Sequence, residues 1–262
     1  MAEEPEVVSE RRGNVLVLRI NRPEARNALN SAVMAGLGKG ITEAESDPDI
    51  RAVVLTGTGD RAFCAGMDLR SFAGGGITPT EEEQQHMGAF MRFMTRGEAG
   101  VPMVGAANAT ALAGGFELLM ACDLIVAAEG TNVGLPEVKR GLFAAGGGMF
   151  LAKRIPLAKA LELTMTGDPI SVDEALALGL INKVAPADKV LDEAVALADR
   201  IAANGPLGVQ ATKQLVRMAA YEPSADVWKV HSELQGKVFA SEDAKEGATA
   251  FVEKRPPVWK GR

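Results

Sequence analysis

The stretch RAVVLTG at residues 51–57 decides the fold, because it is the second of two short β-branched runs that enclose a helical pattern. The first run, NVLVLRI at residues 14–20, ends at the turn-forming segment NRPEARN. Runs of this length and composition are typical of buried strands. We therefore predict a buried strand at each run, with a helix between them.

The helical pattern begins at Ser31, after which apolar residues recur every three or four positions, at Val33, Leu37, Ile41 and Ala44. Ser31 is the predicted N-cap, because a hydroxyl at that position accepts a hydrogen bond from a first-turn amide. Strand, helix and strand in this order form a right-handed crossover. The first part of the chain is therefore predicted to be α/β with parallel pairing.

Further elements follow in the middle of the chain. VPMVGAA (101–107) and DLIVAAE (123–129) have the composition of two more strands. FAGGGITPTEEEQQ (72–85) combines glycines, a proline and acids, which predicts a mobile loop that leads into a helix over about 81–95.

After Pro156 the pattern becomes mostly helical, as in VLDEAVALADRIAA (190–203). One face of that helix is formed by Val190, Ala194, Leu197 or Ala198, and Ile201. We therefore predict an α/β core over residues 1–185, which holds the site, and a helical C-terminal region over residues 186–262.

Composition limits the kind of partner. The chain of 262 residues is 47% hydrophobic and 24% charged, so it can bury a core and is not expected to be disordered. A net charge of -6 without a basic stripe argues against a nucleic-acid surface. Local basic residues and backbone amides must then hold any polyanionic ligand.

The first residues, MAEEPEVVSERRG, lack the pattern of a signal peptide, and the longest uncharged stretch, GVPMVGAANATALAGGF, falls short of a membrane span. Two cysteines form neither a disulfide framework nor a zinc site. We therefore expect a soluble, cytoplasmic protein that is not bound to a membrane.

Several common kinds of site are not expected. His86 and His231 lack a ligand-spaced partner, so no metal site is predicted, and Cys64 has no base beside it and is interpreted as a small buried thiol. GLFAAGGG (141–148) is neither a Walker loop nor a dinucleotide fingerprint, and no Gly-x-Ser-x-Gly elbow occurs.

Two glycine-containing turns suggest a different chemistry. AFCAGMDL (62–69) leaves amides near Met67 free to donate, and AGGFE (113–117) begins a helix at Gly114, whose first amides have no partner within the helix. If these turns converge, their amides form an oxyanion hole.

Two glutamates accompany these turns. Glu117 enters an apolar run, and Glu137 lies in GLPEVKRG beside a proline. Glutamate is rarely buried without a partner, although one in the first turn of a helix is commonly a surface residue. Two acids in apolar settings beside amide donors are what acid–base chemistry next to a carbonyl requires.

The sequence resembles the enoyl-CoA hydratase/isomerase (crotonase) superfamily along nearly its whole length. The segments that carry the resemblance are NRPEARNALN, AFCAGMDL, GGFELLMACDLIVAAE, GLPEVKRGLFAAGGG, TGDPISVDEALALGLINKV and SEDAKEGATAFVEKRPPVWKGR. The resemblance implies a crotonase-like spiral of ββα units with a helical C-terminal region that serves trimerisation and part of the acyl/CoA pocket. It also implies a homotrimer or a dimer of trimers, an acyl-CoA substrate of the kind met in fatty acid β-oxidation, and no metal or redox cofactor, coenzyme A being part of the substrate.

The resemblance also implies roles for single residues. The backbone amides of Met67 and Gly114 would bind the thioester oxygen, Glu117 would activate water, and Glu137 would deliver a proton. The expected CoA contacts are Ala25, Arg26, Ala28, Ala65, Asp68, Leu69, Arg70 and, from this subunit or a neighbouring one, Lys254. Solvated surface is the alternative interpretation of Arg26 and Arg70.

Two departures from the family pattern are visible: Ala109 follows Asn108 where glycine is common, and Ala113 precedes two glycines instead of completing three. The segments around the two glutamates are as similar to the carnitinyl-CoA dehydratase branch as to short-chain hydratases. We predict a 2-enoyl-CoA hydratase. The alternatives are an enoyl-CoA isomerase, a carnitinyl-CoA dehydratase-like enzyme, and a non-catalytic acyl-CoA-binding member of the fold.

Overall fold

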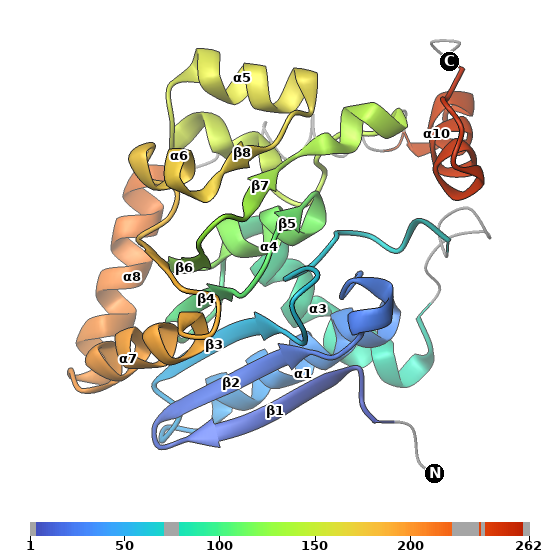
Figure 1. Ribbon diagram of the computed structural model, residues 1–262. Helices are drawn as coiled ribbons and strands as arrows, with labels where there is room; N and C mark the ends of the chain where they lie inside the picture. The colour runs from blue at the N-terminus through green and yellow to red at the C-terminus, as the bar shows by residue number, and fades with distance from the viewer. Residues whose placement is uncertain (1–3, 71–78, 222–235, 237–238, 259–262) are drawn as a thin grey trace.

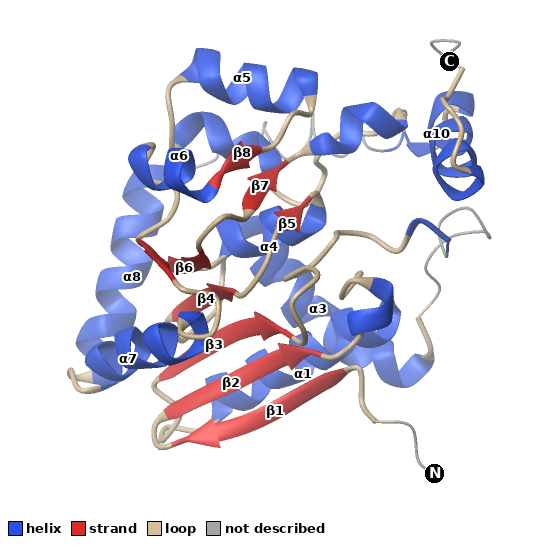
Figure 2. Cartoon of the chain, viewed as in Figure 1, coloured by secondary structure: helices blue, strands red, loops and turns tan. Residues whose placement is uncertain are grey.

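The computed structural model describes residues 4–70, 79–221, 236 and 239–258 of the chain. Figure 1 shows the course of the chain, and Figure 2 its helices and strands. The strands are β1 (Val7–Arg12), β2 (Val15–Ile20), β3 (Ala52–Gly57), β4 (Met103–Ala107), β5 (Ala111–Leu112), β6 (Leu124–Ala128), β7 (Asn132–Gly134), β8 (Ile170–Ser171) and β9 (Lys183–Ala185). The helices are η1 (Pro23–Ala25), α1 (Ser31–Ser46), α3 (Glu81–Arg96), α4 (Gly114–Ala121), η2 (Pro136–Arg140), η3 (Gly148–Lys153), α5 (Leu157–Thr166), α6 (Val172–Ala177), α7 (Val190–Ala202), α8 (Pro206–Tyr221) and α10 (Glu242–Glu253).

The larger sheet has six strands in the order β1-β2-β3-β4-β6-β9. Only the β1–β2 pair is antiparallel; β2–β3, β3–β4, β4–β6 and β6–β9 are all parallel. The runs at 14–20 and 51–57 are thus confirmed as neighbouring parallel strands, with α1 between them as predicted. Parallel neighbours need a crossover connection, which is why helices separate these strands along the chain.

A smaller sheet of β5, β7 and β8 lies beside α4 (Figure 2). The chain alternates between the sheets, because β5 follows β4 and β7 follows β6, and β5 pairs with β7 in parallel. This alternation gives the ββα turns that the resemblance implies. Because α4 follows β5 and η2 follows β7, the parallel β5–β7 pair also brings the starts of α4 and η2 to the same end of the smaller sheet.

The two faces of the larger sheet are covered by different helices. In β2, Leu16 and Leu18 belong to the cluster that includes α1 and α3, whereas Val15 and Val17 pack in the cluster that includes α7. This alternation follows from the two-residue period of a strand. A helix from the C-terminal region, α7, therefore completes the core of the sheet.

The predicted face of α7 is nearly as expected: Val190, Ala194 and Ala198 are fully buried. Leu197 and Ile201 are only partly buried and pack at the edge of that cluster. The last strand ends at Ala185, and only helices follow in the part of the chain that the structure describes.

The predicted N-cap of α1 was wrong by one residue. Asn30 is the cap, and its side-chain oxygen accepts a hydrogen bond from the Val33 amide at 2.9 Å. Ser31 is instead the first helical residue, and its hydroxyl donates to Glu83 of α3. Asparagine and serine are equally good N-caps, so residue type alone does not distinguish Asn30 from Ser31. The cap is the residue just before the first helical residue, which is Asn30.

The helix predicted over 81–95 is confirmed as α3, which ends one residue later. A capping box fixes its start, since Thr80 and Glu83 each accept from the backbone amide of the other. Residues 72–78 of the predicted mobile loop lie outside the described residues.

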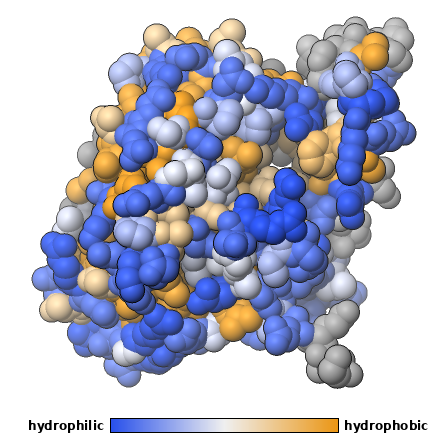
Figure 3. Space-filling view, in the orientation of Figure 1, coloured by the Kyte–Doolittle hydropathy of each residue, from blue (hydrophilic) through white to orange (hydrophobic). Residues whose placement is uncertain are grey.

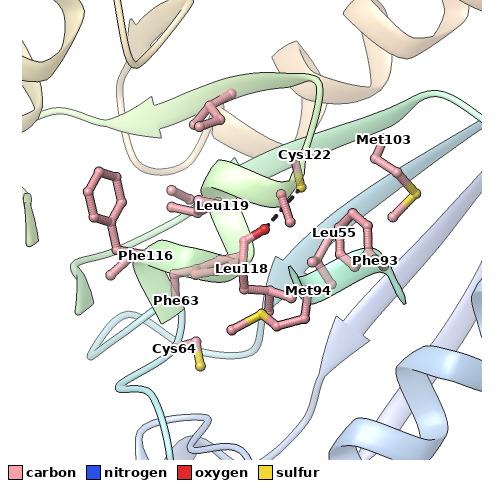
Figure 4. Close-up of a cluster of buried hydrophobic side chains, with 14 of the residues drawn as sticks. Leu55, Phe63, Cys64, Phe93, Met94, Met103, Phe116, Leu118, Leu119 and Cys122 are labelled. Carbon is pink, nitrogen blue, oxygen red and sulfur yellow. Dashed lines mark hydrogen bonds between the residues drawn. The ribbon is translucent and has the colours of Figure 1, made fainter. Parts of the chain in front are cut away.

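Helix α4 is embedded in apolar side chains (Figure 4). Leu118 and Leu119 are fully buried, and the Cys122 thiol donates to the Leu118 carbonyl at 3.5 Å. Cys64 lies on the other side of α4 in this view and is also a buried free cysteine, as predicted. Burial raises the pKa of the Cys64 thiol to about 12, which favours the protonated thiol at neutral pH.

The surface seen in Figure 3 is mostly hydrophilic, with hydrophobic residues exposed on α5 and α6. They include Leu157, Leu161, Met165 and Leu176. Helix α10 stands at the edge of the molecule beside η2 (Figure 1). Within the described ranges, no helix has the length and apolar content needed to cross a membrane.

Candidate active site

Three segments that are distant in sequence run side by side at the start of α4. Met67 forms a bridge with Leu29, and Cys64 forms one with Ala111. The Ala65 amide donates to the Arg26 carbonyl at 3.1 Å, and the Leu112 amide donates to Cys64. These contacts place the turn that carries Met67 next to the one that carries Gly114.

The amides of Met67 and Gly114 lie close together. Gly66 has a positive φ of +88°, and a Cβ placed on it would lie 2.9 Å from the Gly114 nitrogen. A Cβ on Gly114 would lie 3.7 Å from the Met67 nitrogen. Within the described part of the chain, neither amide donates to a protein acceptor. Two neighbouring amides without an acceptor are the donors that the predicted oxyanion hole needs, and that role stays a prediction.

The start of α4 is a tight junction. Its N-cap is Ala113, whose φ of 52° and ψ of -132° are unusual for a residue with a side chain, and no side chain caps the helix. A Cβ on Gly115 would lie only 2.0 Å from the Cys64 carbonyl oxygen, so only glycine allows this approach. This junction fixes α4 and thereby the position of Glu117, in its first turn.

Glu117 is buried, with 5% of its surface exposed. Its Oε1 atom accepts hydrogen bonds from the backbone amides of Gly146 and Gly148, each at 2.8 Å. Burial raises the pKa of the Glu117 carboxyl to about 7, and the amides of this glycine loop limit the rise. The carboxyl is therefore poised to exchange a proton near neutral pH.

Glu137 has a different environment. It follows Pro136 at the start of η2, and both of its carboxylate oxygens are buried without a hydrogen-bond partner among the described residues. Burial, followed by the negative charge of Glu117, raises the pKa of the Glu137 carboxyl to about 8. The two glutamates are thus close enough to influence one another.

The difference in environment separates the two acids. Amide donors at 2.8 Å stabilise the ionised form of Glu117, whereas at Glu137 burial and the negative charge of Glu117 outweigh its own backbone amide, which favours the ionised form. Near neutral pH the favoured arrangement has Glu117 ionised and Glu137 protonated. Two acids held in opposite protonation states can act as a base and an acid in one reaction.

Most of the predicted CoA contacts form one region next to Met67. Arg26 and Arg70 are exposed, Ala28 is buried, and Asp68 forms a salt bridge with Arg22 at 3.3 Å. The remaining predicted contacts in this region are Ala25, at the end of η1, and the half-buried Ala65 and Leu69.

Lys254 lies elsewhere, at the C-cap of α10. It lines a cavity of about 340 Å³ with Lys139, Arg140, Phe251 and others. Helix α10 approaches η2 closely, since a Cβ on Gly247 would lie 1.8 Å from the Arg140 carbonyl oxygen. In this chain, Lys254 is therefore placed beside the element that carries Glu137.

Sequence reasoning missed the loop that holds Glu117. The run Gly146–Gly148 fits no nucleotide-binding motif, yet the amides of Gly146 and Gly148 bind the carboxylate. Three consecutive glycines after an apolar stretch are a signal for accessible backbone amides. A cavity of about 810 Å³ that reaches Glu117 was also not foreseen.

No three potential metal ligands of the histidine, cysteine, aspartate and glutamate types converge within the described residues. His86 is half-buried on α3, and His231 lies outside the described residues.

The chain matches the family model of enoyl-CoA hydratase/isomerase over residues 10–262. It is 39% identical to the enoyl-CoA hydratase EchA19 of Mycobacterium tuberculosis over 98% of this chain and 97% of that protein. It is also 36% identical to the carnitinyl-CoA dehydratase of Proteus mirabilis, over 96% and 97% of the two chains. The crystal structure of carnitinyl-CoA hydratase from Mycobacterium avium superposes with a TM-score of 0.88 at 43% identity, covering 99% of this chain and 100% of that one.

Proposed function

Because the chain belongs to the enoyl-CoA hydratase/isomerase family of the crotonase superfamily and is a hydro-lyase-type enzyme, we propose that it hydrates the 2,3 double bond of a 2-enoyl-CoA thioester. The observation that carries this proposal is the unequal pair of buried glutamates beside two free amides. A hydratase needs a base, an acid and an anion site at the same carbon atoms, and this arrangement offers all three.

In the proposed reaction, ionised Glu117 accepts a proton from water while the water oxygen bonds to carbon 3. The electron pair of the double bond then moves toward the thioester oxygen, where the amides of Met67 and Gly114 stabilise the enolate. Protonated Glu137 donates its proton to carbon 2. The net change is the addition of one water molecule, and a proton passing from Glu117 to Glu137 restores the starting state.

The surroundings of each acid support this division of roles. The glycine-loop amides favour a charged carboxylate, which suits a base, and the unpartnered position of Glu137 favours the neutral acid. Because hydration is neither an oxidation nor a reduction, the reaction needs no redox cofactor.

Recognition of CoA is part of the same proposal. The segments 25–28 and 65–70 lie side by side, and the second of them contains Met67. The first would contact the nucleotide of CoA, and the second would contact the pantetheine. Lys254 lies apart from them in this chain, so it would contact the CoA of a neighbouring subunit in the trimer that the resemblance implies.

Turnover of crotonyl-CoA tests this proposal. We expect loss of the absorbance of the conjugated thioester and formation of 3-hydroxybutyryl-CoA that carries one oxygen atom from labelled water. Conversion of a 3-enoyl-CoA without incorporation of solvent oxygen, in the absence of hydration, would indicate an isomerase instead. Binding of acyl-CoA with neither reaction would indicate a non-catalytic member of the fold.

A further inference from the structure

A cavity of about 810 Å³ extends from Glu117 along α4 toward the C-terminal ends of α3 and α4. Its walls come from the end of α3, the segment 97–100, the second half of α4, and α8. Glu117 and Gly147 line it, whereas Met67, Gly114 and Glu137 do not, so the cavity adjoins the acid that is proposed to act at carbon 3. It is therefore placed to receive the part of the acyl group beyond carbon 3.

Cationic side chains outnumber acids on these walls. The cations are Arg92, Arg96, Arg154, Lys213 and Arg217, and the acids are Glu45, Glu98 and Glu117. The chain as a whole carries a net charge of -6, so this excess of positive charge is local. Such a local field favours ligands of the opposite sign.

Two of these cations are neutralised one to one near the mouth of the cavity. Arg92 pairs with Glu45 at 3.0 Å, and Arg96 pairs with Glu98 at 3.8 Å. These pairs have largely solvated side chains and contribute little net charge.

Lys213 and Arg217 differ from Arg92 and Arg96, because they share one carboxylate, that of Asp123. The Lys213 Nζ atom lies 2.8 Å from Oδ2, and the Arg217 Nε atom lies 2.8 Å from Oδ1. The Lys213 side chain is only 11% exposed, so this excess positive charge is poorly screened. Two cations and one anion leave a net charge of about +1 at this wall.

Both cations are held in place by backbone acceptors. Lys213 also donates to the Val101 carbonyl at 2.7 Å, and Arg217 donates to the Ala121 carbonyl at 2.8 Å. Burial lowers the pKa of Lys213, the Asp123 carboxylate opposes that effect, and the like charge of Arg217 adds to it. A second anion next to this group would complete the compensation.

The spacing suits an acyl chain. Ala121, whose carbonyl accepts from Arg217, lies four residues beyond Glu117, which is about 6 Å along an α-helix. A chain that extends a few carbons past the reacting double bond would bring its terminal group close to these cations.

We propose that the acyl group of the preferred substrate ends in a carboxylate that enters this cavity and pairs with Lys213 and Arg217. This inference rests on the proposed hydration of a 2-enoyl-CoA and adds the class of acyl group. A quaternary ammonium, as in a carnitinyl group, would meet cations of its own sign. A long alkyl chain would remove water from charged groups without compensating them.

Three thioesters of similar length test the inference: 2-hexenoyl-CoA, its analogue with a terminal carboxylate, and 4-trimethylammonio-2-butenoyl-CoA. We expect kcat/KM to be at least about tenfold higher for the thioester with a terminal carboxylate than for 2-hexenoyl-CoA. It should be lowest for 4-trimethylammonio-2-butenoyl-CoA. Equal or lower kcat/KM for the carboxylate ester would overturn the inference.

Charge removal provides a second arm. Lys213→Gln should lower the ratio of kcat/KM between the carboxylate ester and 2-hexenoyl-CoA by about tenfold, and Lys213→Arg should restore it. Lys183→Gln is the matched control, because Lys183 is an exposed lysine that pairs with Glu193 away from the cavity. An unchanged ratio in folded Lys213→Gln would contradict the proposal.

Binding separates this inference from the proposed function. Calorimetry with the unreactive adipoyl-CoA and hexanoyl-CoA needs no turnover, and we expect adipoyl-CoA to bind at least about tenfold more tightly to the wild-type protein. If no thioester is hydrated but this preference holds, the hydratase proposal fails and the carboxylate site stands. If 2-hexenoyl-CoA is hydrated but adipoyl-CoA does not bind more tightly than hexanoyl-CoA, the hydratase proposal stands and the carboxylate site fails.

Discussion

Glu117 and Glu137 have the same side chain and are both shielded from water, yet their partners differ. Glu117 accepts two backbone amides at 2.8 Å, whereas both oxygens of Glu137 are buried without a partner within the described chain. Burial raises both pKa values, to about 7 and about 8. The comparison teaches that burial makes both acids available near neutral pH, and that hydrogen bonding decides which of them ionises first.

The largest expected effect comes from removing either acid. We expect Glu117→Gln and Glu137→Gln each to lower kcat for crotonyl-CoA hydration by about a hundredfold or more, because each removes one proton-transfer step. Steady-state assays at pH 7.5 measure this loss.

Glu43→Gln, on the exposed side of α1, is the control and should retain wild-type activity. Wild-type rates in both buried variants would contradict a mechanism that uses this pair.

The second effect is on stability. The pKa of Glu137 is raised from 4.5 to about 8, so its stabilising contribution is fully present below pH 4.5 and is lost as the pH rises through 8. Glutamine does not ionise, so Glu137→Gln should gain stability relative to wild type between pH 5 and pH 9. We expect a gain on the order of a few kcal/mol in the free energy of unfolding, measured by urea denaturation.

Glu117→Gln should gain less over the same pH range, because the pKa of Glu117 is raised only to about 7. An equal or larger gain for Glu117→Gln would show that the glycine-loop amides do not distinguish the two acids.

The third effect tests the glycine loop directly. A Cβ on Gly148 would lie 2.3 Å from the Ala144 Cβ and 3.2 Å from the Glu117 Oε1 atom, so Gly148→Ala should displace the amide from the carboxylate. We expect about a tenfold lower kcat and an acidic limb of the pH–rate profile that moves to higher pH, since the anion of Glu117 loses a donor.

Gly88→Ala on α3 is the matched control, because no atom lies within 4 Å of its added methyl group. A Gly148→Ala variant with an unmoved acidic limb would assign the loop a purely structural role.

The smallest effect concerns the junction before α4. Ala113 holds a φ of 52°, which glycine adopts without strain, so Ala113→Gly should raise the free energy of unfolding by about 1 kcal/mol or less after the entropic cost of glycine. Ala89→Gly in α3 should instead lower it by about 1 kcal/mol. Thermal unfolding of the two variants measures the difference in sign.

Much of the fold could be predicted from short-range patterns. The β-branched runs identified β2 and β3, and the acids that follow the glycines and proline of residues 72–85 located α3. Short strands such as β5 and β8, with two residues each, could not be predicted, because they exist only through pairing with β7.

The sequence pointed to the residues of the candidate site, but it could not predict the different surroundings of Glu117 and Glu137. Glycines next to Met67 and Glu117 indicated free amides and a buried acid. The cradle formed by Gly146 and Gly148, and the pairing of Lys213 and Arg217 with Asp123, join segments far apart in sequence. No local pattern encodes such contacts, so only the folded chain reveals them.

The pH dependence of kcat/KM for crotonyl-CoA hydration tests the central claim most directly. Ionised Glu117 is needed as the base, so activity should rise as the pH increases through about 7, and protonated Glu137 is needed as the acid, so activity should fall above about 8. We expect a bell-shaped profile with its maximum between these values. A profile that stays flat from pH 5.5 to pH 9.5, on the order of four units, would contradict the assignment of base and acid to these two glutamates.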